Sequence, residues 1–285
     1  MLGNVQTADQ VVADEATASL ISFSIIRRRA FYMSVPITSR QNPWFKRVRD
    51  ALHEHRDEIV LEGPKFVDDA VRAGWQPLAV FHRSSVPGPR SSVATWPVLA
   101  LSSDLFDSLT DTKSPQGVIA LFERPRFTLN DLQSENRGPR TEDSIFVALD
   151  GVQDPGNVGT IVRLAAAFDC AGVLLLPGCA DAYSPKAIRA SVGAVLFVPV
   201  VNANAADLIR SGLPMFAADV RGSTTSLPAD GAIIVFGSEG RGVSDEIRAA
   251  ATPVSITMSS RVESLNVAAS AAILLSKNYE ARRGR

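Results

Sequence analysis

Residues 144–163 read SIFVALDGVQDPGNVGTIVR, and this stretch decides the class of fold. The apolar run at 145–149 has the length and composition of a buried β-strand, and a helix is expected to start near Val158. A buried strand that passes through a short loop into a helix is the repeating unit of a parallel α/β sheet.

The same alternation continues toward the C-terminus. Further apolar runs of strand length cover residues 172–176, 196–200, 215–219, 232–236 and 254–256. Further helices are expected near Pro185, Ala205 and Ser244, and an alanine-rich helix over residues 265–279. We therefore predict, over residues 144–281, a mainly parallel sheet with helices on both faces, followed by a flexible basic tail at residues 282–285.

The sequence that precedes this domain predicts a smaller α/β domain at residues 36–123. Helical spacing covers residues 44–56 and 63–73, Ser103 is expected to cap a short helix, and strands are expected at 58–61, 78–81 and 117–122. Residues 124–143 lose the apolar period and contain several prolines, glycines and asparagines, which is typical of a linker.

The first 35 residues show no folded pattern. We expect a disordered extension at residues 1–35, or an over-long start with Met33 as the true initiator. The apolar run at 20–26 is too short to span a bilayer and precedes three arginines, so it does not fit an export signal. We therefore expect a cytoplasmic protein that is not inserted in a membrane.

The composition limits the classes of function. A formal net charge of −1 gives no global attraction to nucleic acid, so any RNA contact requires a local basic patch. The two cysteines and three histidines stand apart from other metal ligands, and we expect no metal site.

Ligands of parallel sheets bind at the carboxyl ends of the strands, and three loops there carry unusual residues. The first contains Asn157, expected at the helix cap, and Arg163 six residues later; a cap plus an exposed arginine is the plainer interpretation. The second is Gly237-Ser238-Glu239-Gly240-Arg241-Gly242. Its glycines would let backbone approach a ligand closely and Glu239 offers an acceptor, although a tight charged turn would explain the same residues.

The third loop leads into the alanine-rich helix through Ser264 and Asn266. Capping accounts for one of these polar residues but not for both. No G-x-G-x-x-G follows the first strand and no Walker lysine is present, which weighs against NAD and ATP.

These residues carry a family resemblance. Asn157 with Arg163, Gly237-Ser238-Glu239-Gly240 with Gly242, and residues 264–268 are similar, in order and spacing, to the three motifs of the SpoU, or TrmH-like, RNA 2′-O-methyltransferases of the SPOUT superfamily. Glu62-Gly63-Pro64 and residues 111–117 resemble the small ribosomal-protein-like substrate domain that precedes the catalytic domain in many members.

The resemblance implies a fold and a cofactor. It implies a SPOUT-type parallel sheet with a deep trefoil knot, a homodimer, and S-adenosylmethionine as the methyl donor. Donor contacts would come from the backbone of Gly237, Ile256 and Leu265, with Ser264 and Asn266 beside them.

The resemblance also implies that Arg163 activates the ribose hydroxyl, with Asn157 and Glu239 in support. A guanidinium has a pKa above about 12 and is a poor general base, so an arginine that orients the hydroxyl and stabilises the developing oxyanion is more reasonable. An RNA phosphate, Glu239 or water would then take the proton. A catalytically silent RNA-binding module and a small-molecule enzyme remain as alternatives.

The RNA surface is less sharply defined by the sequence. A basic cluster lies beside Trp44 and Phe45, made of Arg40, Lys46, Arg47 and Arg49. Such a mixture can hold phosphate and stack a base, although a solvated amphipathic helix gives the same pattern. Arg189 is a further phosphate-contact candidate because it precedes a loop expected near the active-site edge. We expect a structured RNA substrate, ribosomal rather than transfer RNA.

Overall fold

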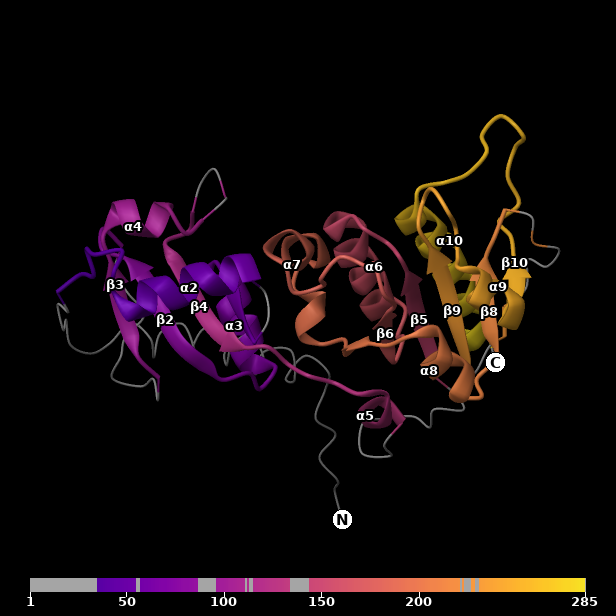
Figure 1. The fold of residues 1–285 in the computed structure, drawn as a ribbon, viewed down its shortest axis with the longest axis horizontal. Coiled ribbons are helices and arrows are strands. Elements are labelled where there is room, and N and C mark those ends of the chain that lie inside the picture. The colour runs from indigo at the N-terminus through magenta and orange to yellow at the C-terminus, as the bar shows by residue number, and fades with distance from the viewer. Residues whose placement is uncertain are drawn as a thin grey trace, which may run out of the picture. The chain divides into compact units, whose positions relative to one another are not determined.

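A computed structural model describes residues 35–54, 57–86, 96–110, 112, 115–133, 144–220, 222, 227–228 and 231–284. The expectations for the N-terminal extension therefore fall, apart from Val35, outside the described residues. The chain divides into two compact units (Figure 1). The N-terminal unit holds residues up to Asp50 together with 60–68 and 75–123, and the C-terminal unit holds 51–59, 69–74 and 124–285.

The first sheet has four strands in the order β1-β4-β2-β3. Their bounds are Glu58–Glu62 for β1, Pro77–Arg83 for β2, Val98–Leu101 for β3 and Val118–Glu123 for β4. Three helices accompany them, α2 at Pro43–Glu54, α3 at Pro64–Arg72 and α4 at Ser103–Asp107. Strand β3 was not predicted because half of its four residues are only partly buried, and the N-cap of α4 is Ser102 rather than Ser103.

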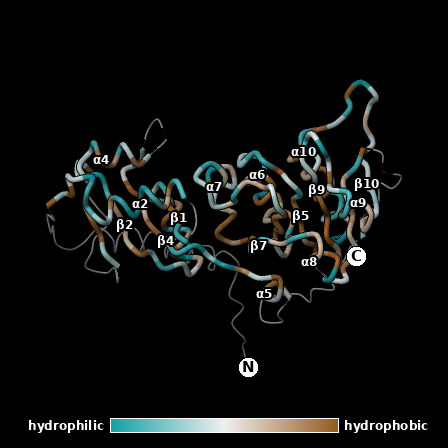
Figure 2. Tube along the Cα trace, in the orientation of Figure 1, coloured by the Kyte–Doolittle hydropathy of each residue, from teal (hydrophilic) through white to brown (hydrophobic). Residues whose placement is uncertain are grey.

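The second sheet is all-parallel, as the sequence predicts. Its six strands lie in the order β10-β8-β9-β5-β6-β7. Their bounds are Ile145–Asp150 for β5, Gly172–Leu175 for β6, Val200–Asn202 for β7, Met215–Ala218 for β8, Ala232–Gly237 for β9 and Thr252–Val254 for β10. The central strands β5 and β9 are almost wholly buried and follow hydrophobic paths in Figure 2, because helices cover both faces of the sheet.

Alternate residues of the strands pack against the two helical layers. On one face, Phe146, Leu174 and Ile233 share a core cluster with residues of α8 (Ala205–Arg210) and α9 (Asp245–Ala250). The other layer contains α6 (Pro155–Ala167), α7 (Pro185–Ser191) and α10 (Val267–Arg283), in which α6 packs against both α7 and α10. The α/β class with a parallel sheet is therefore confirmed.

Two strands differ from their predicted positions. Residues 194–196 form a 3₁₀ turn instead of opening a strand, and β7 begins only at Val200. Gly193, with φ of 85°, starts this turn, which buries Val195 and Leu196 without extending them and leaves Phe197 exposed. Strand β10 ends at Val254, which leaves Ile256 in the loop that follows.

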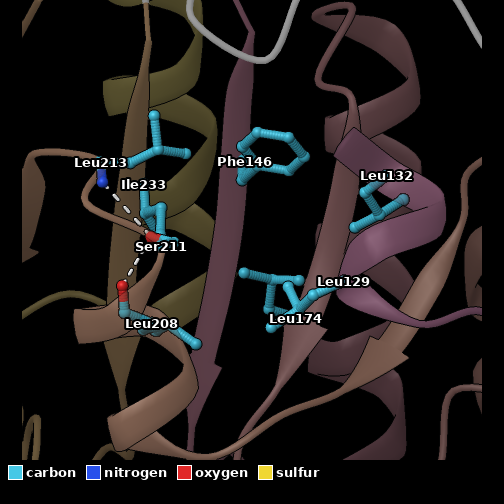
Figure 3. Close-up of a pocket in the computed structure, with 8 residues that line it drawn as sticks. All are labelled: Leu129, Leu132, Phe146, Leu174, Leu208, Ser211, Leu213 and Ile233. Carbon is cyan, nitrogen blue, oxygen red and sulfur yellow. Dashed lines mark hydrogen bonds between the residues drawn. The ribbon is translucent and has the colours of Figure 1, made fainter. Parts of the chain in front are cut away.

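A short helix lies within the segment predicted as a linker. Helix α5 covers Leu129–Gln133, and Leu129 and Leu132 pack against the core cluster of the C-terminal unit. Figure 3 shows both leucines facing Phe146 and Leu174 across a cavity of about 10 Å³, which is at the lower limit for a single water. The segment is thus partly built into the C-terminal unit.

The C-terminal helix extends further than predicted. Helix α10 continues to Arg283, and Arg282 donates hydrogen bonds to the carbonyl oxygens of Phe168 and Asp169, just beyond the end of α6. A cation at a helix C-terminus is stabilising, so Arg282 belongs to the fold rather than to a free tail. Within the described residues, no helix has the length and apolar character that crossing a membrane requires.

Candidate active site

The N-terminus of α6 is capped by Asp154, not by Asn157 as predicted. Asp154 Oδ1 accepts a hydrogen bond from Gly156 N at 2.8 Å, and Pro155 occupies the first helical position. Lys186 Nζ donates to the same oxygen at 2.7 Å; this hydrogen bond, more than that from Gly156, lowers the pKa of Asp154. Because the cap is already filled, the Asn157 side chain is available for other contacts.

Asn157 joins the three motifs in one hydrogen-bonded chain. Its Nδ2 donates to Glu239 Oε1 at 2.5 Å, and its Oδ1 accepts from Asn266 Nδ2 at 3.2 Å. Asn266 Oδ1 in turn accepts from Ala268 N and Ala269 N and so caps α10. A carboxylate only accepts, so Glu239 fixes which way the amide of Asn157 faces.

The glycine-rich loop after β9 closes on itself. Ser238 and Gly242 exchange two backbone hydrogen bonds of 3.1 and 2.8 Å. A Cβ at Gly237 would lie 2.0 Å from Gly242 C and 2.2 Å from Val243 N. The missing side chain of Gly237 thus makes room for the loop's own backbone, and the Gly237 main chain can still contact a ligand.

The predicted donor-pocket residues follow β9 and β10 at the carboxyl edge of the sheet. Ile256 and Leu265 are half-buried, and their backbone groups make no hydrogen bond within the described part of the chain. Ser264 is exposed, and its hydroxyl is likewise unpaired among the described residues. Unpaired main-chain donors and acceptors at half-buried positions are what a ligand held by backbone contacts requires. The loop is therefore compatible with S-adenosylmethionine held by these backbone groups, as the family resemblance implies.

Within one chain, Arg163 does not contact the hydrogen-bonded network of Asn157, Glu239 and Asn266. It is exposed on α6, and its side chain has no hydrogen bond or ion pair in the described structure. Gly159, one turn earlier on the same helix face, packs against α7, whereas Asn157 faces Glu239 and Asn266.

The predicted RNA-contact residues are mostly exposed. Arg189 is exposed on α7, and Arg40 and Arg47 are exposed in the N-terminal unit, where Lys46 is half-buried. The guanidinium of Arg47 lies 5.3 Å from the centre of the Trp44 ring, so one face of that indole is already covered.

Phe45 cannot serve in base stacking because only 3% of it is exposed. The two sequence motifs of the N-terminal unit do meet: Thr112 donates to the carboxylate of Glu62, and Gly63 N donates to Val118 O at 2.9 Å. Residues 111, 113 and 114 of the second motif lie outside the described residues.

Sequence reasoning missed two supports of the glycine-rich loop. Asp150 Oδ2 accepts from Ser244 N at 2.7 Å, and Arg248 Nη2 donates to Val243 O at 2.8 Å. Asp150 could have been found from its place directly after a predicted strand, but no pattern marks Arg248. No set of three metal-ligating side chains is grouped together in the described residues. Burial raises the pKa of the Cys170 thiol to about 12, and burial also raises that of Cys179.

Comparison with known proteins gives the family. The SpoU rRNA Methylase family model matches residues 144–276, and an MRM3-like substrate binding domain matches residues 46–120. An uncharacterized tRNA/rRNA methyltransferase of Synechocystis is 30% identical over 272 residues, which cover 87% of this chain and 93% of that protein. The chain belongs to the SpoU rRNA methylase family. The predicted family is confirmed, and the chain is a methyltransferase of this family.

Two further relatives have specific names. The chain is 27% identical over 226 residues to the 23S rRNA (guanosine(2553)-2′-O)-methyltransferase RlmP of Bacillus subtilis, covering 76% of this chain and 86% of that protein. It is 32% identical over 167 residues, 56% of this chain, to the mitochondrial rRNA methyltransferase 3 of Mus musculus, of which it spans only 39%.

A solved rRNA methyltransferase structure matches most of the chain. The AdoMet-bound rRNA methyltransferase from Sinorhizobium meliloti superposes with a TM-score of 0.75 at 27% identity, covering 86% of this chain and 97% of that one.

Proposed function

We propose that this protein transfers a methyl group from S-adenosylmethionine to a ribose 2′-hydroxyl of structured RNA, ribosomal rather than transfer RNA. The observation that carries the proposal is the hydrogen-bonded chain from Glu239 through Asn157 to Asn266, because it unites the three family motifs at one edge of the sheet. The names of the Bacillus subtilis and mouse relatives favour ribosomal RNA.

The donor supplies an electrophilic methyl group on a cationic sulfonium. The backbone of Gly237, Ile256 and Leu265 would hold it, with Ser264 and Asn266 beside it. Two observations support this assignment: the main-chain groups of Ile256 and Leu265 are unpaired among the described residues, and the neighbouring network fixes the amide of Asn266.

Three side chains would act on the ribose. Negative charge develops on the 2′-oxygen as it attacks, and the guanidinium of Arg163 is suited to orient the hydroxyl and stabilise that charge. Glu239 has one oxygen bound to Asn157, which leaves the other carboxylate oxygen to accept a hydrogen bond or a proton. Asn157 positions that carboxylate.

The binding partners follow from the same assignment. Arg189, Arg40, Lys46 and Arg47 would contact RNA phosphates, and their exposed or half-buried guanidinium and ammonium groups permit it. A homodimer with a trefoil knot, acting in the cytoplasm, is part of the proposal on the basis of the family resemblance. The side chain of Arg163 has no partner among the described residues of its own chain, and a homodimer would allow it to act with residues of a second chain.

Single-turnover methyl transfer with Arg163→Ala tests the mechanism. With saturating RNA and donor, the rate should fall about a hundredfold or more, the usual cost of losing one preorganised oxyanion donor, while donor affinity measured by calorimetry changes much less. Arg163→Lys keeps the charge but loses the planar fork, so a large residual defect would show that orientation matters. Wild-type transfer by Arg163→Ala would remove Arg163 from the mechanism, and RNA binding without donor binding by the wild type would favour the silent module.

A further inference from the structure

Arg248 of α9 contacts three segments at the carboxyl edge of the second sheet. Its Nη2 donates to Val243 O at 2.8 Å, its Nη1 pairs with Asp245 Oδ1 at 2.5 Å, and its Nε lies 3.9 Å from Asp219 Oδ2. The side chain is 38% exposed, whereas Arg210, which makes the same (i, i+3) pair with Asp207 on α8, is 73% exposed. The Arg248 side chain is therefore more buried than an ion pair on a helix surface requires.

The segment that Arg248 holds is the end of the glycine-rich loop. Val243 directly follows Gly242, whose Cβ position would lie 3.9 Å from Arg248 Nη2. The backbone of these two residues fills the space in front of Gly237. A hydrogen bond to Val243 O therefore restrains the stretch of loop that sets the position of the Gly237 main chain.

The second contact reaches the neighbouring strands. Asp219 follows β8, and its backbone N–H donates to Val254 O, the last residue of β10, at 3.0 Å. Ile256 lies two residues beyond that carbonyl. One guanidinium thus connects the loop after β9 with the end of β8 and, through Asp219, with the segment that enters the loop after β10.

We propose that Arg248 is a positioning residue for the methyl donor: it holds the loops that carry Gly237 and Ile256 at the separation the donor needs. The inference rests on the proposed function, because it takes these loops as the donor pocket. A planar guanidinium can hydrogen-bond the Val243 carbonyl and the Asp245 carboxylate while its Nε, which makes no hydrogen bond within the described residues, faces Asp219 at ion-pair distance. A lysine ammonium on a flexible stem cannot do this with the same geometry. Without this restraint, the loops must be ordered when the donor binds, so the cost falls on donor affinity and not on the methyl-transfer step.

Calorimetric titration of the full-length protein with S-adenosylmethionine tests this role, together with single-turnover transfer at saturating donor. Arg248→Lys should raise the donor Kd about tenfold or more and change the saturated rate by less than about threefold. Arg210→Lys is the matched control, since it alters the same kind of pair on α8 without contact to either loop; its donor Kd should equal that of the wild type.

Three outcomes would overturn the inference: wild-type donor affinity in Arg248→Lys, an equal loss of affinity in Arg210→Lys, or a loss of saturated rate as large as the loss of affinity. If thermal unfolding shows that Arg248→Lys does not fold, Asp219→Asn decides. That variant keeps the bond to Val243 but removes the charge of Asp219 from the ion pair, and it should raise the donor Kd by about two- to fivefold; an unchanged Kd would contradict the proposal. Failure of the wild type to bind the donor would instead reject the proposed function.

Discussion

The hydrogen bond from Asn157 to Glu239 depends on an amide that donates through one atom and accepts through the other. Asn157→Asp keeps the shape but places a second carboxylate against Glu239. Like charges at this distance repel, so we expect the carboxylates to move apart and the network to Asn266 to break. The single-turnover rate at neutral pH should fall about a hundredfold, with donor and RNA saturating.

The pH dependence of this variant provides its control. Two adjacent carboxylates raise the pKa of one of them, and the protonated member can donate to the other. The ratio of the Asn157→Asp rate to the wild-type rate should therefore rise as the pH falls toward about 5. Asn157→Ala cannot recover in this way, and equal pH profiles for the two variants would contradict the role of the hydrogen bond.

Gly237 and Gly240 lie in the same loop but differ in the space around them. A Cβ at Gly237 would overlap the Gly242 backbone, whereas one at Gly240 would meet nothing within 4 Å. Gly237→Ala should therefore lower both the unfolding temperature and the donor affinity, and Gly240→Ala should keep the unfolding temperature of the wild type. Thermal unfolding and calorimetry on both variants check this; a stable Gly237→Ala protein with weak donor binding would restore the simpler pocket interpretation.

Much of the candidate site was predictable from single residues. Asn157, Glu239 and Asn266 were identified by residue type and spacing, and the structure brings them into contact. The cap was misassigned because Asp154 and Asn157 both have capping side chains, and Pro155 at the first helical position was the signal that favours Asp154. The approach of Arg248 to Asp219 could not be predicted because it joins segments whose spacing depends on the completed sheet.

Helices α6 and α7 approach each other closely at Gly159, which has no side chain. A Cβ at Gly159 would lie 2.2 Å from Ala187 O and 2.8 Å from Ala190 Cβ. Gly159→Ala should force the helices apart and lower the free energy of unfolding by about 1–3 kcal/mol, the usual cost of overpacking a core. Chemical denaturation measures this. Gly156→Ala is the control on the same helix, because its Cβ would come no closer than 3.3 Å to another atom, Asp154 Oδ1.

The elements were predicted best where a run of apolar residues is buried on both faces. Strands β5 and β9 satisfy this condition and were placed to within one residue. The run at 196–200 buries Leu196, Val198 and Val200 but exposes Phe197, and most of it lies in a turn and a connecting segment, because apolar character alone does not fix the backbone conformation. Helix α5 was missed because five residues are too few to show a helical period.

For the chain as a whole, we predict that residues 124–285, the continuous part of the C-terminal unit, carry donor binding by themselves. The donor loops and the Asn157 network all lie in residues 144–285, whereas the substrate-domain match covers residues 46–120. A fragment of residues 124–285 should therefore bind S-adenosylmethionine with nearly the affinity of the full chain. It should methylate RNA far more slowly at limiting RNA, because it lacks Arg40, Lys46 and Arg47.

A shorter fragment of residues 144–285 separates the contribution of α5. Leu129 and Leu132 pack over Phe146 and Leu174, so their removal exposes apolar surface that the longer fragment buries. At about 25 cal/mol per Å² of apolar surface, losing the cover of two leucines costs on the order of 2–4 kcal/mol, and the unfolding temperature should fall by several degrees. Donor affinity should stay within about threefold, since α5 is on the face of the sheet opposite α6 and α10. Equal unfolding temperatures for the two fragments would show that residues 124–143 act only as a connection.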